Sequence, residues 1–344
     1  MGNAIVWLTI AILSFMAVLI LLFIYLVVQR MIEVRVQRKI ADYVKDGSDW
    51  AYRYLIEGDA PAEQIIPDSS TKLIAMEKIL RSYAKNISSD MVSARITDYA
   101  HQFLSPYYRK NLNSLNWSTR MNTLHRILEF RMKDLLDDVL NILNENKHYS
   151  DDEYLQIYRI LAAFQYEDFL QHLLNPKIEM NEMEYRKLLF ELEEKPFLNM
   201  IDHYQDFPSP LKHTVLDMIG VKHLVEMVPF LEERIHDEEL EVRVRSLKAL
   251  SQLGIVQNEK IYYPFVESEN WEERMMVAKI LANVDSPEAV SSLQHLLKDQ
   301  SWWVRSQAAQ SIVQQKNGKS VLRAIVETEE DRYAKDIGKE ALGM

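Results

Sequence analysis

The sequence predicts an all-α protein, an array of stacked helical hairpins that follows a single transmembrane helix. Three observations support this prediction. Only 8 Gly and 10 Pro occur among 344 residues, a long apolar run lies near the N-terminus, and side-chain patterns recur farther along the chain. Gly and Pro interrupt helices, and their scarcity beside abundant Leu, Glu, Lys, Met and Arg favours helix throughout.

The composition also excludes several classes of function. The chain has no Cys, which rules out a disulfide scaffold, a Cys-ligated metal site and a thiol nucleophile. Its 51 acidic residues against 40 basic ones give a net charge of −11. This acidic balance argues against nucleic acid as a general partner, because phosphate binding requires a basic surface.

The first element is an uncharged apolar run at residues 4–28. At about 1.5 Å per residue, about 25 residues give about 37 Å of helix, more than the roughly 30 Å of a bilayer's hydrocarbon core. A cleavable signal peptide would need basic residues before a shorter apolar core, and residues 1–3 are uncharged. We therefore predict that residues 1–28 are a retained membrane anchor.

Basic residues follow the anchor and none precede it. The positive-inside rule then places the N-terminus outside the cell membrane and the rest of the chain in the cytoplasm. Residues 29–57 have the pattern of a basic amphipathic juxtamembrane helix. It could lie on anionic lipid, or it could be a stiff extension that packs on the next domain. In the first case the membrane-surface residues would be Arg30, Arg35, Arg38 and Lys39.

Residues 58–70 combine Gly, Pro and small polar residues, so we predict a linker there. The following residues 71–108 are expected to form N-terminal capping helices, and residues 109–344 the repeat array. The repeat is clearest at Arg243, Arg274 and Arg305, which are 31 residues apart, each followed by small and apolar residues. Each unit holds two apolar-striped helices, and only stacked units would bury a continuous core.

This pattern of an Asp, then Val-Arg, then a small-apolar helix resembles HEAT repeats. It is most similar to the short bacterial type found in phycobilin-lyase-type proteins. The resemblance implies a right-handed α-solenoid whose second helices line the concave side. It also implies that acidic and arginine side chains form a ladder between repeats. Ser268 departs from the pattern, because it stands where an Asp is expected. The implied ladder residues are Asp237, Arg243, Arg274, Asp299 and Arg305.

No catalytic motif is apparent. Gly318-Lys319-Ser320 lacks the earlier glycine of a phosphate-binding loop, and HExxH, GxSxG and GxGxxG are absent. The nine His are too dispersed for a metal-binding pair on one helix. We therefore expect a protein that is not an enzyme and has no cofactor or bound metal.

The favoured function is a membrane-anchored scaffold or adaptor that binds a protein partner on its second helices, because Met, Trp and Arg suit such surfaces. Alternatively, these Met and Trp side chains only pack between repeats. Two other functions stay open: a non-catalytic accessory subunit of a membrane enzyme complex, for example in polysaccharide synthesis or transport, and a lyase-type HEAT enzyme. The expected partner-binding residues are Val244, Arg245, Lys248, Met275, Met276, Lys279, Trp302 and Gln307.

Overall fold

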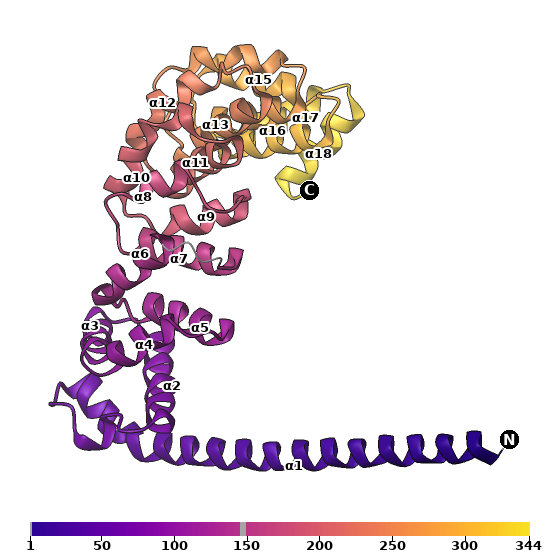
Figure 1. Ribbon diagram of the computed structural model, residues 1–344. Coiled ribbons are helices and arrows are strands. Elements are labelled where there is room, and N and C mark those ends of the chain that lie inside the picture. Colours follow the sequence, from indigo (N-terminus) through magenta and orange to yellow (C-terminus); the bar gives the residue numbers. More distant parts are fainter. Residues whose placement is uncertain (1, 145–148) are drawn as a thin grey trace. The chain divides into compact units, whose positions relative to one another are not determined.

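The computed structural model describes residues 2–144 and 149–344, and all regular elements in these ranges are helices (Figure 1). The all-α prediction is thereby confirmed. The chain divides into two compact units, Met1–Ile160 and Leu161–Met344. Unit 1 contains α1 (Gly2–Tyr52), α2 (Ser70–Asn86), α3 (Asp90–Tyr99), α4 (Ser105–Leu112), α5 (Trp117–Glu129), α6 (Leu136–Asn144) and most of α7 (Asp151–Ala163).

Helix α1 combines two environments. Among the described residues it is the one helix long and apolar enough to cross a membrane, and its residues 7–28 are all exposed. Farther along the same helix Ile40 and Ala51 are buried in the core of unit 1, followed by Leu55 in the π-helical turn Arg53–Glu57. No break in the helix separates the two parts, because both halves have helix-forming sequences and only their polarity changes.

The polypeptide that follows α1 is tied to α3. The guanidinium of Arg95 donates to the carbonyl oxygens of Leu55 and Ile56 at 2.9 and 3.0 Å, and the Tyr54 hydroxyl donates to the Arg95 carbonyl at 3.1 Å. The last carbonyls of a helix have no partner within it, so Arg95 satisfies two of them. Gly58, at φ +87°, then turns the chain into the segment that precedes α2.

Unit 2 consists of two layers of helices, as Figure 1 shows for the segments labelled there. The first helices form one layer: α8 (Phe169–Leu174), α10 (Glu194–Ile201), α12 (Val228–Arg234), the short turn Tyr263–Glu267, α15 (Pro287–Leu296) and α17 (Gly318–Thr328). The second helices form the other: α9 (Glu182–Glu191), α11 (Ser209–Val221), α13 (Leu240–Leu253), α14 (Trp271–Leu281), α16 (Trp302–Gln314) and α18 (Arg332–Leu342).

Small residues let successive second helices pack closely in the order of the chain. A Cβ atom added to Gly220 of α11 would lie 3.1 Å from the Cα of Ala249 in α13. Ala278 of α14 and Ala308 of α16 are likewise buried. The second helices therefore form a continuous layer. The face of this layer that does not pack on the first helices is available to solvent.

Candidate functional site

Arginine side chains join the N-terminal turns of successive second helices. In α13, Arg243 donates through Nε to Glu273 of α14 at 2.6 Å and through Nη1 to the carbonyl of Asp237 at 3.0 Å. In α14, Arg274 donates to both carboxylate oxygens of Asp299 at 2.5 and 2.9 Å, and to the carbonyl of Ser268 at 2.6 Å. Each arginine thus caps its own turn and binds the next repeat.

The ladder contact expected at Ser268 is made by a residue that the repeat pattern did not indicate. Glu273, a buried residue of α14, supplies the carboxylate that an Asp at position 268 would have supplied. The Ser268 hydroxyl donates a short hydrogen bond to this carboxylate. Unit 1 has an equivalent arginine–glutamate contact between helices. Arg120 of α5 donates to Glu153 of α7 through two hydrogen bonds of 2.6 and 3.1 Å.

The ion pairs set the charge state of their acids. Burial works to raise the pKa of Asp299, but the hydrogen bonds from Arg274 and from the Ser301 backbone N–H outweigh it, and the pKa lies below its ordinary value. Glu153 is affected in the same way: burial opposes, and Arg120 and Ser150 lower its pKa. Both carboxylates are therefore charged at neutral pH and are structural.

Two expected ladder residues have other partners. The carboxylate of Asp237 accepts a hydrogen bond from the backbone N–H of Glu239 at 2.9 Å, and only its carbonyl accepts from an arginine. Arg305 of α16 donates to the carbonyls of Asp299 and Gln300. Its guanidinium carbon then lies 5.4 Å from the centre of the Tyr333 ring in α18. The last rung is therefore a cation–π contact.

The residues expected to contact a partner lie on the second helices and differ in accessibility. Lys279 and Trp302 are exposed, whereas Val244, Met275 and Met276 are half-buried. Gln307 is also half-buried and donates to Ser311 at 3.1 Å. Met275 and Lys279 are one helical turn apart in α14, so they share one stretch of surface.

Arg245 and Lys248 belong to a charged cluster around Asp217. Asp217, which is 4% exposed in α11, accepts hydrogen bonds from Arg245 at 2.7 Å, Lys248 at 2.8 Å and Arg186 of α9 at 3.0 Å. Arg245 also contacts Glu182 and Glu241. Three second helices are thus joined across their common face. Asp217 was missed because it lies within the apolar segment Val215–Ile219, where its burial gave no separate signal.

The four basic residues after the apolar part of α1 are exposed, and Arg30 pairs with Glu33 at 2.9 Å. On another side of the helix Ile40 is buried and Val36 and Val44 are half-buried. The apolar face of this segment therefore packs on unit 1 from about Val36 onward, which supports the stiff-extension alternative for this part.

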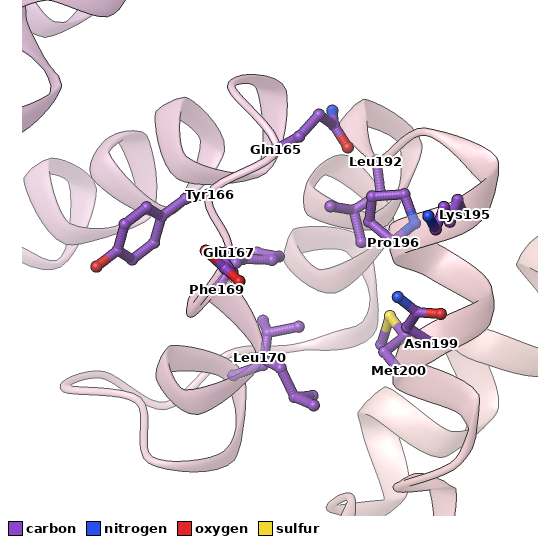
Figure 2. A pocket seen from close by; sticks show the side chains of 11 residues that line it. Gln165, Tyr166, Glu167, Phe169, Leu170, Leu192, Lys195, Pro196, Asn199 and Met200 are labelled. Carbon is purple, nitrogen blue, oxygen red and sulfur yellow. The ribbon is translucent and has the colours of Figure 1, made fainter.

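A pocket of about 300 Å³ lies between α8 and α10, in the layer of first helices. Figure 2 shows Phe169 and Leu170 on one wall, and Pro196 and Met200 on the other. Lys195 and Asn199 add polar groups, so the pocket could hold one apolar side chain with a polar end. This volume is at the lower limit for small-molecule sites. The remaining lining residues are Gln165, Tyr166, Glu167, Leu173 and Leu192.

Within the described ranges, no three His, Asp or Glu side chains are grouped so that they could hold a metal ion. Ion pairs between helices instead join many of the charged side chains. What the arrangement can do is present a stable, mixed apolar and charged surface to another molecule.

Comparison with known proteins identifies the repeats. The family model of HEAT repeats matches residues 263–343, so the resemblance inferred from the sequence is confirmed there. No curated protein matches the chain. Solved structures with similarity include an engineered protein, with 13% identity, coverage of 89% of this chain and 98% of that chain, and a TM-score of 0.36.

Two further structures are human deoxyhypusine hydroxylase in complex with glycerol and the Pds5–Scc1 complex. The first has 14% identity, covers 88% of this chain and 97% of its own, and has a TM-score of 0.27. The second has 13% identity, covers 89% and 59%, and has a TM-score of 0.29. At these values the likenesses carry no argument about function.

Proposed function

We propose that this chain, whose residues 263–343 are HEAT repeats, is a single-pass membrane protein that presents its repeats as a scaffold for a protein partner. One observation carries the proposal. An uncharged apolar segment whose residues 7–28 are all exposed continues without interruption into the core of a folded unit. Exposed apolar surface of this length is unfavourable in water and favourable in a bilayer.

The orientation proposed is N-terminus outside and repeats in the cytoplasm, at the cell membrane. The exposed residues Arg30, Arg35, Arg38 and Lys39 support it, since basic residues near a span stay on the cytoplasmic side. At that depth they would also meet anionic headgroups. The apolar run is joined to unit 1 by continuous helix, because Ile40 and Ala51 of the same helix are core residues of that unit.

The partner is proposed to bind the second helices around Met275 and Lys279, on the face that does not pack on the first helices. Helical repeat arrays recognise partners along such extended faces, and a half-buried Met beside an exposed Lys offers both apolar and charged contacts. The salt-bridged cluster around Asp217 holds Arg245 and Lys248 in fixed positions on the same layer. Less conformational freedom is then lost on binding.

The test compares capture of a partner by the full chain and by a form that begins at Gln29. A form beginning after Gly58 would be unsuitable, because it would remove Ile40, Ala51 and Leu55 from the core of unit 1. Both forms should capture the same protein, and Met275→Glu should abolish capture. The matched control is Val225→Glu, which changes an exposed apolar residue in the other layer.

The alternatives predict other results. If only the full chain captures the partner, the apolar helix itself is the binding element, as expected for an accessory subunit of a membrane enzyme complex. If capture tolerates Met275→Glu fully, the proposed face is wrong. A bound chromophore or cofactor in the purified protein would favour the lyase-type enzyme.

A further inference from the structure

Four exposed apolar side chains occupy one position in four successive repeats. Leu240, Trp271, Trp302 and Tyr333 are spaced 31 residues apart, and between 37% and 67% of each is exposed. We call them the aromatic row after its three aromatic members, the fourth being the aliphatic Leu240. The first three begin α13, α14 and α16, and Tyr333 is the second residue of α18. Core packing does not require large apolar groups at exposed helix starts, where polar residues predominate.

The ladder contacts show that the members of the aromatic row are neighbours in space. The hydrogen bond from Arg243 to Glu273 joins the first turns of α13 and α14. The bonds from Arg274 to Asp299 join α14 to the start of α16. The contact of Arg305 with the Tyr333 ring joins α16 to α18. The row therefore runs along one edge of the second-helix layer.

Three acidic side chains and one Gln accompany the aromatic row at the same period. Glu238, Glu269, Gln300 and Asp331 each precede a member by two residues. The carboxylates of Glu238 and Glu269 are exposed and make no hydrogen bond or ion pair within the described part of unit 2. An edge of aromatic rings with free carboxylates attracts cations, which also bind favourably over Trp and Tyr rings. It repels phosphate groups of nucleic acids and anionic lipids.

The spacing of the row selects the conformation of a ligand. Packed helices lie about 8–10 Å apart. A polyproline II helix repeats its side-chain direction every three residues, or about every 9.3 Å, so one residue per turn would meet each member of the row. An extended strand fails this test, because its side chains alternate and every third residue points away.

We propose that the aromatic row binds a basic, proline-rich segment of a partner protein in the polyproline II conformation. Prolines would pack on Leu240, Trp271 and Trp302, and the intervening Lys or Arg side chains would lie near Glu238 and Glu269. Aromatic-lined grooves recognise such segments because the ligand is already ordered before it binds. The inference rests on the proposed scaffold function. It extends the surface around Met275 toward the helix starts, because Trp271 and Met275 are one helical turn apart in α14.

The probe is a fluorescent peptide of four Pro-Pro-Arg triplets, titrated into the full chain in nanodiscs of zwitterionic lipid. Binding should be saturable and should weaken as salt is raised, since exposed charges are screened. The double variant Trp271→Ala/Trp302→Ala should lose at least about tenfold in affinity, as for central aromatic contacts. Glu238→Gln/Glu269→Gln should lose about threefold or more, consistent with exposed ion pairs.

Matched controls lie outside the row. Phe190→Ala removes an exposed aromatic ring from the end of α9, and Glu327→Gln removes an exposed carboxylate from α17. Both should bind the peptide within about twofold of the unchanged protein, as expected for residues away from the site. Circular dichroism should show equal helicity for all variants, and the Glu variants test the proposal if the Trp variant does not fold.

Several results would overturn the inference. They are absence of binding at about 1 mM peptide, equal binding of four Pro-Pro-Glu triplets, or equal binding of four Gly-Gly-Arg triplets, which keep the charge but not the polyproline II conformation. A change of oligomeric state in Trp271→Ala/Trp302→Ala would instead make the edge a contact between two copies. If Met275→Glu abolishes partner capture while the row variants leave it intact, the scaffold proposal stands and this inference fails.

Discussion

At the scale of single residues, arginine connects one repeat to the next. Arg120, Arg243 and Arg274 each donate to a carbonyl of the preceding turn and to a carboxylate of the following repeat. The planar guanidinium suits this double role, because its donors point in several fixed directions. A lysine, with a single ammonium group, could replace only part of these contacts.

We expect Glu273→Gln to destabilise unit 2 by about 2–4 kcal/mol, because it leaves the guanidinium of Arg243 without its buried charged partner. Urea unfolding followed by circular dichroism measures the change. Glu272→Gln, at the neighbouring half-buried position, serves as control and should stay within about 0.5 kcal/mol of the unchanged protein. Equal effects of the two substitutions would mean that the rung does not stabilise the repeats.

The lowered pKa of Asp299 predicts a pH dependence. Its stabilising effect is fully present above the ordinary Asp pKa of about 3.9 and is lost as pH falls through the lower pKa of the folded protein. Asp299→Asn should therefore be clearly less stable than the unchanged protein at pH 7, and the difference should shrink below about pH 4. A difference that grows on acidification would contradict this assignment.

The positions of these arginines could be predicted from the sequence, but their partners could not all be. The 31-residue spacing indicated Arg243, Arg274 and Arg305, and Asp299 stood at the expected distance. Glu273 escaped notice because it is on the helix and not in the turn before it. Which carboxylate an arginine reaches depends on side-chain direction, and residue spacing alone does not determine that.

At the scale of elements, α1 serves two environments at once. Its apolar half is exposed, and its second half, with the turn that follows, contributes Ile40, Ala51 and Leu55 to unit 1. The change of polarity near residue 28 predicted a boundary between regions. The backbone shows no break there, because helix formation depends on local propensity and continues across a change in polarity.

Leu55→Ala should cost about 2–5 kcal/mol of unit 1 stability, since Leu55 is fully buried and the substitution leaves a cavity. Thermal unfolding of the form that begins at Gln29 measures this cost. Ile32→Ala changes an exposed residue of the same helix and should have an effect below about 0.5 kcal/mol. If Leu55→Ala were as mild, the second half of α1 would not belong to the core.

The orientation of α1 can be tested by charge. Replacing Arg30, Arg35, Arg38 and Lys39 by Glu should increase the fraction of molecules with the opposite orientation, because it removes the basic bias on one side of the span. The chain has no Cys, so a single Cys introduced at exposed Glu327 reports its side of the membrane by labelling with an impermeant reagent. Four Glu substitutions at exposed positions in unit 2 provide the control and should leave the orientation unchanged.

At the scale of the whole molecule, the sequence predicts the fold more completely than it predicts the functional surfaces. Repeated Val-Arg segments and small residues indicated HEAT repeats, and the family match at residues 263–343 agrees. The pocket between α8 and α10 and the cluster at Asp217 were not predicted, because each combines residues from different helices whose separation in space the sequence does not give. The partner's identity depends on such surfaces.

The most direct test of the central claim is photo-crosslinking in native membranes, with a photoreactive residue at position 275 of the full chain. A second form carries the same residue at position 275 with residues 4–28 replaced by an unrelated transmembrane segment, and a third carries it at position 225. We expect one and the same crosslinked protein from the first two forms and none from the third. Loss of the crosslink when the anchor is exchanged, or crosslinking from position 225 alone, would contradict the proposal of a membrane-anchored scaffold that binds through its second helices.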